Sequence, residues 1–293
     1  MDIFMELLSI VLPVFLCAGI GVAWQRMGHP FDTDLVSTLV YKIGVPCLIV
    51  ATFAKVRLTP EAVAEVAGAA AAIYLLTALI AAAILRTARL SLPSYLPSMM
   101  FPLVGSMGLP VCLFAYGENG LALALVYFTL SAMGTFTIGA AIAAGRASWG
   151  KLAREPAVWA AVVVLALLWL DIRVPKWVVD TTGLLGGMTI PLQLLALGCS
   201  LGEFRVTSLP RGVALSLLRL GLGFALGFAI AEAFGLDGTV RAVVILQSAM
   251  PVAVSNYMFA VIYRREPAEV AGMVLLSTAI SFVTLPLLLL YLR

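Results

Sequence analysis

The chain has 293 residues, of which 62% are hydrophobic and only 11% are charged, and its mean hydropathy is +1.09. Soluble domains carry about 25% charged residues, so this composition excludes an ordinary soluble protein and predicts one that crosses a membrane several times. The net charge of +3 is too small to indicate a nucleic-acid partner.

Ten stretches are apolar and long enough to be membrane segments, because a bilayer core needs about 20 apolar residues per helix. They run roughly over 4–24, 34–54, 62–86, 94–116, 119–144, 156–171, 180–201, 211–235, 239–263 and 267–292. The first has acidic residues and no basic region before it, so it is interpreted as a membrane helix rather than a cleaved signal peptide. We therefore predict an all-α membrane protein with ten transmembrane helices.

The fourth and ninth segments are expected to break inside the membrane. Proline removes a helical hydrogen bond and clashes with the preceding turn, and backbone groups freed in this way must face protein or a water-filled cavity. Interrupted helices at matching places in two halves of a chain indicate a transporter binding site, and simple helix kinks are the alternative. The residues concerned are Pro102, Gly105, Gly108 and Pro110 in the fourth segment, and Pro251 with Gln247, Ser248, Ser255 and Asn256 in the ninth.

The order of the segments indicates an internal repeat of five helices. Segments two and seven each place a proline, Pro46 or Pro191, in mid-helix, and segments four and nine share the interrupted pattern. Because five is an odd number, the second copy enters the membrane from the opposite side. We therefore predict two inverted repeats, residues 1–150 and 151–293, whose broken helices four and nine meet near the bilayer midplane.

Two broken helices that meet can bind an anion without a buried lysine or arginine. The N-terminus of each half-helix presents free N–H groups and the positive end of the helix dipole. The predicted substrate-binding residues are Ser106, Gly108, Pro110, Ser248, Pro251, Ser255 and Asn256. Arg219, inside segment eight, is a candidate charge partner of the anion, and snorkelling towards the lipid headgroups is the alternative.

Residues for metal or catalytic chemistry are sparse. The four cysteines lie in apolar segments and form neither a CxxC motif nor a Cys/His cluster, and the single histidine, His29, lies in a loop. This spacing favours free thiols over a disulfide framework or a metal site. We therefore expect no cofactor, no metal and no enzymatic activity.

Positively charged residues in short loops predict the orientation. Loops after odd-numbered segments hold ten lysines and arginines, and the other side holds six. Since such residues concentrate on the cytoplasmic side, both termini are predicted to be periplasmic, in a bacterial inner membrane.

Several of these motifs resemble the auxin efflux carrier family of membrane transporters, in the bacterial branch that includes malonate-type carriers. The likeness spans the whole chain. The most specific pieces are Phe101-Pro102 with Gly105-Ser106-Met107-Gly108-Leu109-Pro110, Phe114-Ala115-Tyr116-Gly117-Glu118, Pro191-Leu192-Gln193-Leu194-Leu195-Ala196-Leu197-Gly198, and Met250-Pro251-Val252-Ala253-Val254-Ser255-Asn256-Tyr257. The resemblance implies the fold of the bile-acid/sodium symporters, with helices 1, 2, 6 and 7 as a scaffold and helices 3–5 and 8–10 as a moving core.

In function, the resemblance implies a secondary transporter of small organic anions, such as malonate, malate or auxin-like acids, with an elevator-type mechanism. Family members often carry asparagines where this chain has Leu103 and Ser106, which leaves the substrate open. The direction of transport and the coupling to protons or sodium also stay open, and a homodimer rests on the resemblance alone. The alternatives are a sodium-coupled symporter of a bulkier amphipathic anion and a non-transporting membrane sensor subunit.

Overall fold

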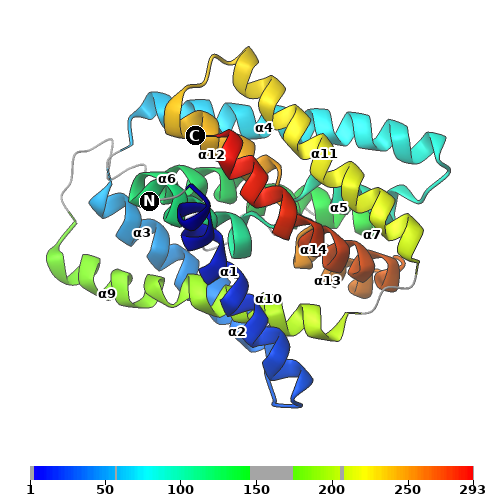
Figure 1. The fold of residues 1–293 in the computed structure, drawn as a ribbon, viewed down its shortest axis with the longest axis horizontal. Helices are drawn as coiled ribbons and strands as arrows, with labels where there is room; N and C mark the ends of the chain where they lie inside the picture. Colours follow the sequence, from blue (N-terminus) through cyan, green and yellow to red (C-terminus); the bar gives the residue numbers. More distant parts are fainter. Residues whose placement is uncertain (1–2, 57, 146–173, 205–207, 293) are drawn as a thin grey trace.

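The computed structural model describes residues 3–56, 58–145, 174–204 and 208–292, and this part of the chain is almost entirely helical (Figure 1). The helices are α1 (Ile3–Arg26), α2 (Thr33–Leu39), α3 (Val45–Lys55), α4 (Pro60–Thr87), α5 (Leu92–Met100), α6 (Leu109–Gly134), α7 (Ala140–Ala144), α9 (Lys176–Gly187), α10 (Thr189–Glu203), α11 (Leu209–Ala233), α12 (Gly238–Ser248), α13 (Val254–Ile262) and α14 (Pro267–Tyr291). Three π-helical turns, η1 (Val40–Gly44), η2 (Val104–Gly108) and η3 (Thr135–Gly139), connect some of them. The predicted sixth membrane segment, 156–171, lies outside the described residues.

Seven helical stretches in the described ranges are long and apolar enough to cross a membrane, so the chain is a multi-pass membrane protein. They are Ser9–Arg26, Thr33–Lys55, Pro60–Thr87, Val104–Ala144, Lys176–Glu203, Leu209–Ala233 and Pro267–Tyr291. The predicted fourth and ninth segments are divided into shorter helices, α5 followed by η2 and α6, and α12 followed by α13.

The stretch Val104–Ala144 has 41 residues, about twice the length that one crossing needs. It bends sharply at Gly117, whose φ of 64° suits glycine. A Cβ atom on Gly120 would lie only 2.6 Å from the carbonyl oxygen of Cys112, although eight residues of straight helix span about 12 Å. The chain therefore turns back at Gly117, between the predicted segments 94–116 and 119–144.

The prolines have two different effects on the helices. Pro46 and Pro110 each follow a π-helical turn and occupy the second position of α3 and α6, where the helix continues without a break. A π-helical turn is wider than an α-helical one and shifts the hydrogen-bond partner by one residue, so a residue without an N–H can follow it. Pro102 and Pro251 instead lie in non-helical segments. The prediction that Pro110 belongs to the first break is therefore wrong, and Pro102 marks that break.

The helices divide into two groups by their contacts. In the first group, here called the panel, α1 packs along α10 and α3 packs on α9, with α2 and η1 against α10 (Figure 1). The second group, here called the bundle, contains α4 to α7 and α11 to α14, in which α11 contacts α4, α12 and α14. Glycines permit the close contacts inside the panel: a Cβ on Gly186 of α9 would lie 2.8 Å from the Cα of Leu48.

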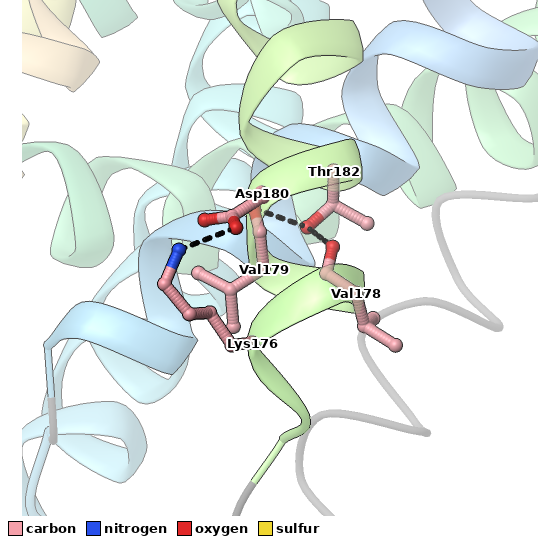
Figure 2. A network of polar contacts seen from close by, with 5 residues as sticks. All are labelled: Lys176, Val178, Val179, Asp180 and Thr182. Carbon is pink, nitrogen blue, oxygen red and sulfur yellow. Dashed lines mark hydrogen bonds and ion pairs between the residues drawn. The ribbon is translucent and has the colours of Figure 1, made fainter.

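The beginning of α9 shows how the edge of the panel is organised. Lys176 Nζ and Asp180 Oδ2 form an ion pair of 2.6 Å one turn apart, and the Thr182 hydroxyl donates to the carbonyl of Val178 at 2.7 Å (Figure 2). The pair is exposed, so it contributes only about 0.3–0.5 kcal/mol. Trp177 and Leu184 are 72% and 81% exposed. Large apolar side chains with such exposure are suited to a lipid-facing surface.

Contact between α1 and α10 should depend on the absence of a side chain at Gly198. A Cβ there would overlap the carbonyl oxygen of Ala18, so Gly198→Ala should destabilise the protein by about 1–3 kcal/mol. Thermal unfolding of the detergent-solubilised protein measures this, with Gly19→Ala as the control because a Cβ on Gly19 meets no atom within 4 Å. Equal melting temperatures for the two variants would contradict the packing.

Candidate functional site

The first break lies between α5 and η2, at residues 101–103. Proline has no N–H and forces the preceding residue towards an extended conformation, and Phe101, with φ −105° and ψ 107°, ends α5 in this way. The second break lies between Ser248 and Val254 and contains Pro251. Each break leaves backbone N–H and C=O groups without helical partners deep in an apolar protein.

The two breaks satisfy each other's backbone groups. Pro102 and Val252 form an antiparallel β-bridge. Around it, the N–H of Leu103 donates to the carbonyl of Pro251 at 2.7 Å, and the N–H of Ala253 donates to the carbonyl of Phe101 at 3.4 Å. Unpaired backbone groups are very costly away from water, so these bonds explain why both helices break at the same place. We call residues 101–103 and 249–253 together the crossing.

Two side chains complete the pairing at the crossing. Asn256, only 3% exposed, donates its amide to the carbonyl of Phe101 at 3.0 Å. Ser277 of α14 accepts a bond of 3.0 Å from the N–H of Val252 and donates to the carbonyl of Val274. Sequence reasoning missed Ser277, since a serine in an apolar helix gives no signal of which backbone it will meet.

Arg219 of α11 lies behind the crossing and is 2% exposed. Its Nη2 donates at 3.0 Å to the carbonyl of Ser248, the last residue of α12, where helix carbonyls lack partners and the helix dipole is negative. A Cβ on Gly223 would lie 2.5 Å from the guanidinium, so glycine at that position leaves room for it. No aspartate or glutamate among the described residues is buried with it. The snorkelling alternative is therefore wrong: Arg219 stabilises the end of a broken helix.

A cavity of about 590 Å³ opens beside the crossing, between the panel and the bundle. The panel contributes α2, η1 and α10 to its wall, and the bundle contributes η2, α6, η3 and α13. Its charged lining residues, Asp34, Lys42 and Glu203, are exposed. The rest of the polar wall consists of hydroxyls and one amide: Thr33, Ser37, Thr38, Tyr41, Ser106, Ser131, Thr135, Ser200, Ser255, Tyr257 and Gln193.

Two helix N-termini meet at this cavity. Val104, Gly105 and Ser106 form the first turn of the helix that leaves the first break, and Val254 and Ser255 begin α13 after the second. The first N–H groups of a helix have no partner within it and carry partial positive charge. The N–H of Val104 donates to the carbonyl of Pro102 at 2.9 Å, so the donors suited to an anion at this cavity are those of Gly105 and Ser106 in the first helix and of Val254 and Ser255 in the second.

The predicted site residues fall in three places. Ser106 and Ser255 line the cavity, Pro251 lies in the crossing, and Asn256 of α13 donates a hydrogen bond to the crossing. The other four are buried and lie outside the cavity wall: Gly108 in η2, Pro110 in α6, Ser248 in α12 and Arg219 in α11. Among the described residues, no group of three or more His, Cys, Asp or Glu side chains could hold a metal ion.

The roles of Gly108 and of three cavity residues that the sequence did not predict depend on how the helices pack. Gly108 is required by packing, because a Cβ there would overlap the side chain of Gln247 from α12. Ser131, Thr135 and Gln193 line the cavity from α6, η3 and α10. These polar side chains stand on helices whose faces cannot be assigned before the helices are packed.

Two interrupted helices whose breaks pair beside a cavity, in a multi-pass membrane protein, are typical of membrane transporters. In a comparison with known families, residues 142–289, about half of the chain, match the family described as membrane transport protein. The chain belongs to this family, and the expected kinship with auxin efflux carriers is confirmed.

The curated relatives of this chain are named as transporters or as an auxin efflux carrier component. The chain is 24% identical over 194 residues to an uncharacterised transporter of Methanocaldococcus jannaschii, covering 62% of this chain and 63% of the relative. It is 32% identical over 159 residues to the probable auxin efflux carrier component 5b of Oryza sativa subsp. japonica, covering 50% and 41%. An uncharacterised transporter of Methanothermobacter thermautotrophicus is 27% identical over 191 residues, covering 62% of each. The chain thus spans less than two thirds of the length of these relatives.

The amide of Asn256 should contribute measurably to the stability of the crossing. Asn256→Leu keeps the side-chain size but leaves the carbonyl of Phe101 with one donor fewer, which should cost about 1–3 kcal/mol. Chemical or thermal unfolding in detergent measures the change, and Asn119→Leu, at an exposed position, is the control. An Asn256→Leu protein as stable as the wild type would show that this bond does not hold the crossing together.

Proposed function

We propose that this protein is a secondary transporter of small organic anions, and that a substrate carboxylate binds in the cavity at the two helix N-termini. The observation that carries the proposal is that Gly105–Ser106 and Val254–Ser255, from two different broken helices, line one cavity. Helix N-termini bind anions through free N–H groups and the helix dipole. The hydroxyls of Ser106 and Ser255 would add donors to the same carboxylate.

The size and polarity of the cavity support a small substrate. Ligand cavities typically have volumes of about 300–1,000 Å³ and a mostly apolar wall with a few polar groups that fix orientation, and 590 Å³ lies in this range. The charged lining residues are exposed, so the inner part of the cavity would bind an anion through dipoles and hydroxyls. Transport, rather than enzymatic chemistry, is also what the names of the curated relatives describe.

We further propose the ten-helix architecture with inverted repeats, residues 1–150 and 151–293. The order of elements supports it, because the same four kinds of element occur twice in the same order: a divided segment, a long helix, a broken segment and a last helix. In the first half these are α2–α3, α4, α5 with the start of α6, and the end of α6 with α7. In the second half they are α9–α10, α11, α12–α13 and α14. Orientation with both termini in the periplasm of a bacterial inner membrane, and assembly as a homodimer, belong to the same proposal.

Alternating access would come from an elevator-like displacement of the bundle against the panel. Helices 1, 2, 6 and 7 would be the scaffold, and helices 3–5 and 8–10 would move. The contacts support this division, because α1 packs mainly on α10 and α3 on α9, while the crossing joins α5, α6, α12 and α13 within the bundle. The substrate cavity lies at the boundary, where displacement would open it to the other side.

Uptake into proteoliposomes of the purified protein tests the proposed function. Labelled malonate, malate and indole-acetate are offered with and without a sodium or proton gradient. Saturable uptake of one anion, inhibited by its relatives, supports a carrier, and dependence on one gradient identifies the coupling ion, including the sodium-coupled alternative. Absence of flux for every anion by folded protein would favour the sensor alternative.

A negative charge at Ser106 should abolish anion binding. Ser106 lies in the first turn of η2 and lines the cavity, so in Ser106→Asp a carboxylate of the protein would take the place of the substrate's carboxylate. We expect the uptake of Ser106→Asp to fall at least tenfold. Asparagine has nearly the shape of aspartate but no charge, so Ser106→Asn should retain uptake. Equal uptake by the two variants, both folded, would place the anion elsewhere.

A cross-link between the panel and the bundle should stop transport. Phe204, at the end of α10, and Tyr257 of α13 have ring centroids 4.6 Å apart across this boundary. In a protein with its native cysteines replaced by alanine, Phe204→Cys with Tyr257→Cys should lose uptake after treatment with a short thiol cross-linker. Cleavage of the linker should restore it, because the variant itself is folded.

The matched control joins two residues inside the bundle. Arg241 of α12 and Glu232 of α11 form an exposed ion pair of 2.7 Å. Arg241→Cys with Glu232→Cys should be cross-linked equally well and keep its uptake. Transport that continues in the panel-to-bundle cross-linked protein would contradict an elevator-like displacement.

A further inference from the structure

Gln193 of α10 is a buried amide without a partner in the wall of the cavity. The residue is 4% exposed, and neither its Nε2 nor its Oε1 forms a hydrogen bond. Burying a polar group without a hydrogen bond is costly, so such a group calls for an explanation. Among the described residues, it is the only cavity-lining residue with a buried side-chain polar atom that lacks a partner.

The amide of Gln193 lies close to the place where the substrate carboxylate is proposed to bind. A Cβ on Gly105 would lie 3.6 Å from Nε2 of Gln193 and 2.8 Å from the ring of Phe128. Gly105 belongs to the first turn of η2, one of the two helix N-termini at the cavity. The Gln193 amide therefore stands across the panel–bundle boundary from the place where the carboxylate is proposed to bind.

A second glutamine shows that this arrangement is particular to Gln193. Gln247 is also buried with both amide atoms unpaired, but it packs against Gly108 and does not line the cavity. An unpaired amide that only fills space, as Gln247 does, has no access to a ligand. Gln193, in contrast, has unpaired amide atoms and is part of the cavity wall.

The chemistry of an amide restricts the ligand that satisfies it. Nε2 donates hydrogen bonds and Oε1 accepts them. A carboxylate has only acceptor oxygens, so it can pair with Nε2 and leaves Oε1 without a donor. A ligand that satisfies both atoms carries a hydroxyl or N–H group next to its carboxylate.

We infer that Gln193 is a specificity-determining residue that selects carboxylates bearing a neighbouring hydrogen-bond donor. The substrate class is then hydroxy acids, or acids with a nearby N–H, in preference to the same acids without the donor. This inference rests on the proposed transport of organic anions and narrows its substrate.

Matched pairs of acids test the inference. The pairs are malate and succinate, and lactate and propionate, whose members differ only in a hydroxyl group next to a carboxylate. Binding to the purified protein is measured by thermal shift and by competition against labelled uptake. For whichever pair binds, the wild type should prefer the donor-bearing acid by about tenfold or more, the discrimination expected when a buried polar group is left unpaired.

Variants of Gln193 and of a second residue in the cavity wall test whether the substrate preference depends on Gln193. Gln193→Leu should bind both members of the pair about equally. Ser200→Ala, two turns further along the same helix and also in the cavity wall, should keep the preference whatever its effect on the rate. If Gln193→Leu does not fold, Gln193→Asn moves the amide back by one methylene and should likewise reduce the preference.

The outcomes distinguish the two levels of the argument. A wild type without preference within a pair that it transports, or an unchanged preference in Gln193→Leu or Gln193→Asn, would overturn the inference and leave anion transport standing. Folded wild-type protein that neither binds nor transports any of the acids would overturn the proposed function, and the inference with it.

Discussion

The mutual pairing of two backbone breaks is the constraint on which the rest of the structure depends. A helix interrupted in a membrane exposes N–H and C=O groups that lipid cannot satisfy. Here each break supplies the partners for the other, through the bonds from Leu103 to Pro251 and from Ala253 to Phe101. Neither break is tolerable without the other, so residues about 150 positions apart in the chain must fold into contact.

Other features follow from this pairing. Asn256 and Ser277 supply the bonds that the short β-bridge leaves unmade, and Arg219 pairs with the carbonyl end of α12. Gly223 and Gly227 of α11 leave room for Ser248, since a Cβ on either would overlap it. The same geometry turns the two helix beginnings, at Val104 and Val254, towards one cavity. Satisfying the backbone on one side thus leaves free donors on the other.

Local chemistry made much of the fold predictable from the sequence. The membrane segments follow from runs of apolar residues, and the breaks follow from Pro102 and Pro251, whose effect acts within one turn. Pro110 was misplaced because its effect depends on the π-helical turn before it, which the residue pattern does not reveal. The first break therefore lies at Pro102 and not at Pro110.

The candidate site was less predictable because its residues acquire their roles through distant partners. Ser106 and Ser255 adjoin the breaks, so the sequence predicts them as binding residues, and both line the cavity. Gln193 lies in the cavity only because α10 packs beside η2, and Ser277 meets Val252 only because α14 packs beside α13. Arg219 was recognised as unusual, yet its partner, Ser248, lies 29 residues further along the chain. Hydropathy identifies such residues as exceptions without identifying what they contact.

The pairing of Arg219 with Ser248 also bears on how the chain enters the membrane. An arginine at the centre of a membrane helix costs about 2.5–3.5 kcal/mol on insertion scales. Its acceptor belongs to α12, which is synthesised after α11. While α11 is the newest helix at the ribosome, its guanidinium has no Ser248 carbonyl to bind and must remain near water or lipid headgroups. Full insertion of α11 is therefore expected to wait for α12, so the two helices would enter the bilayer as one unit during biosynthesis.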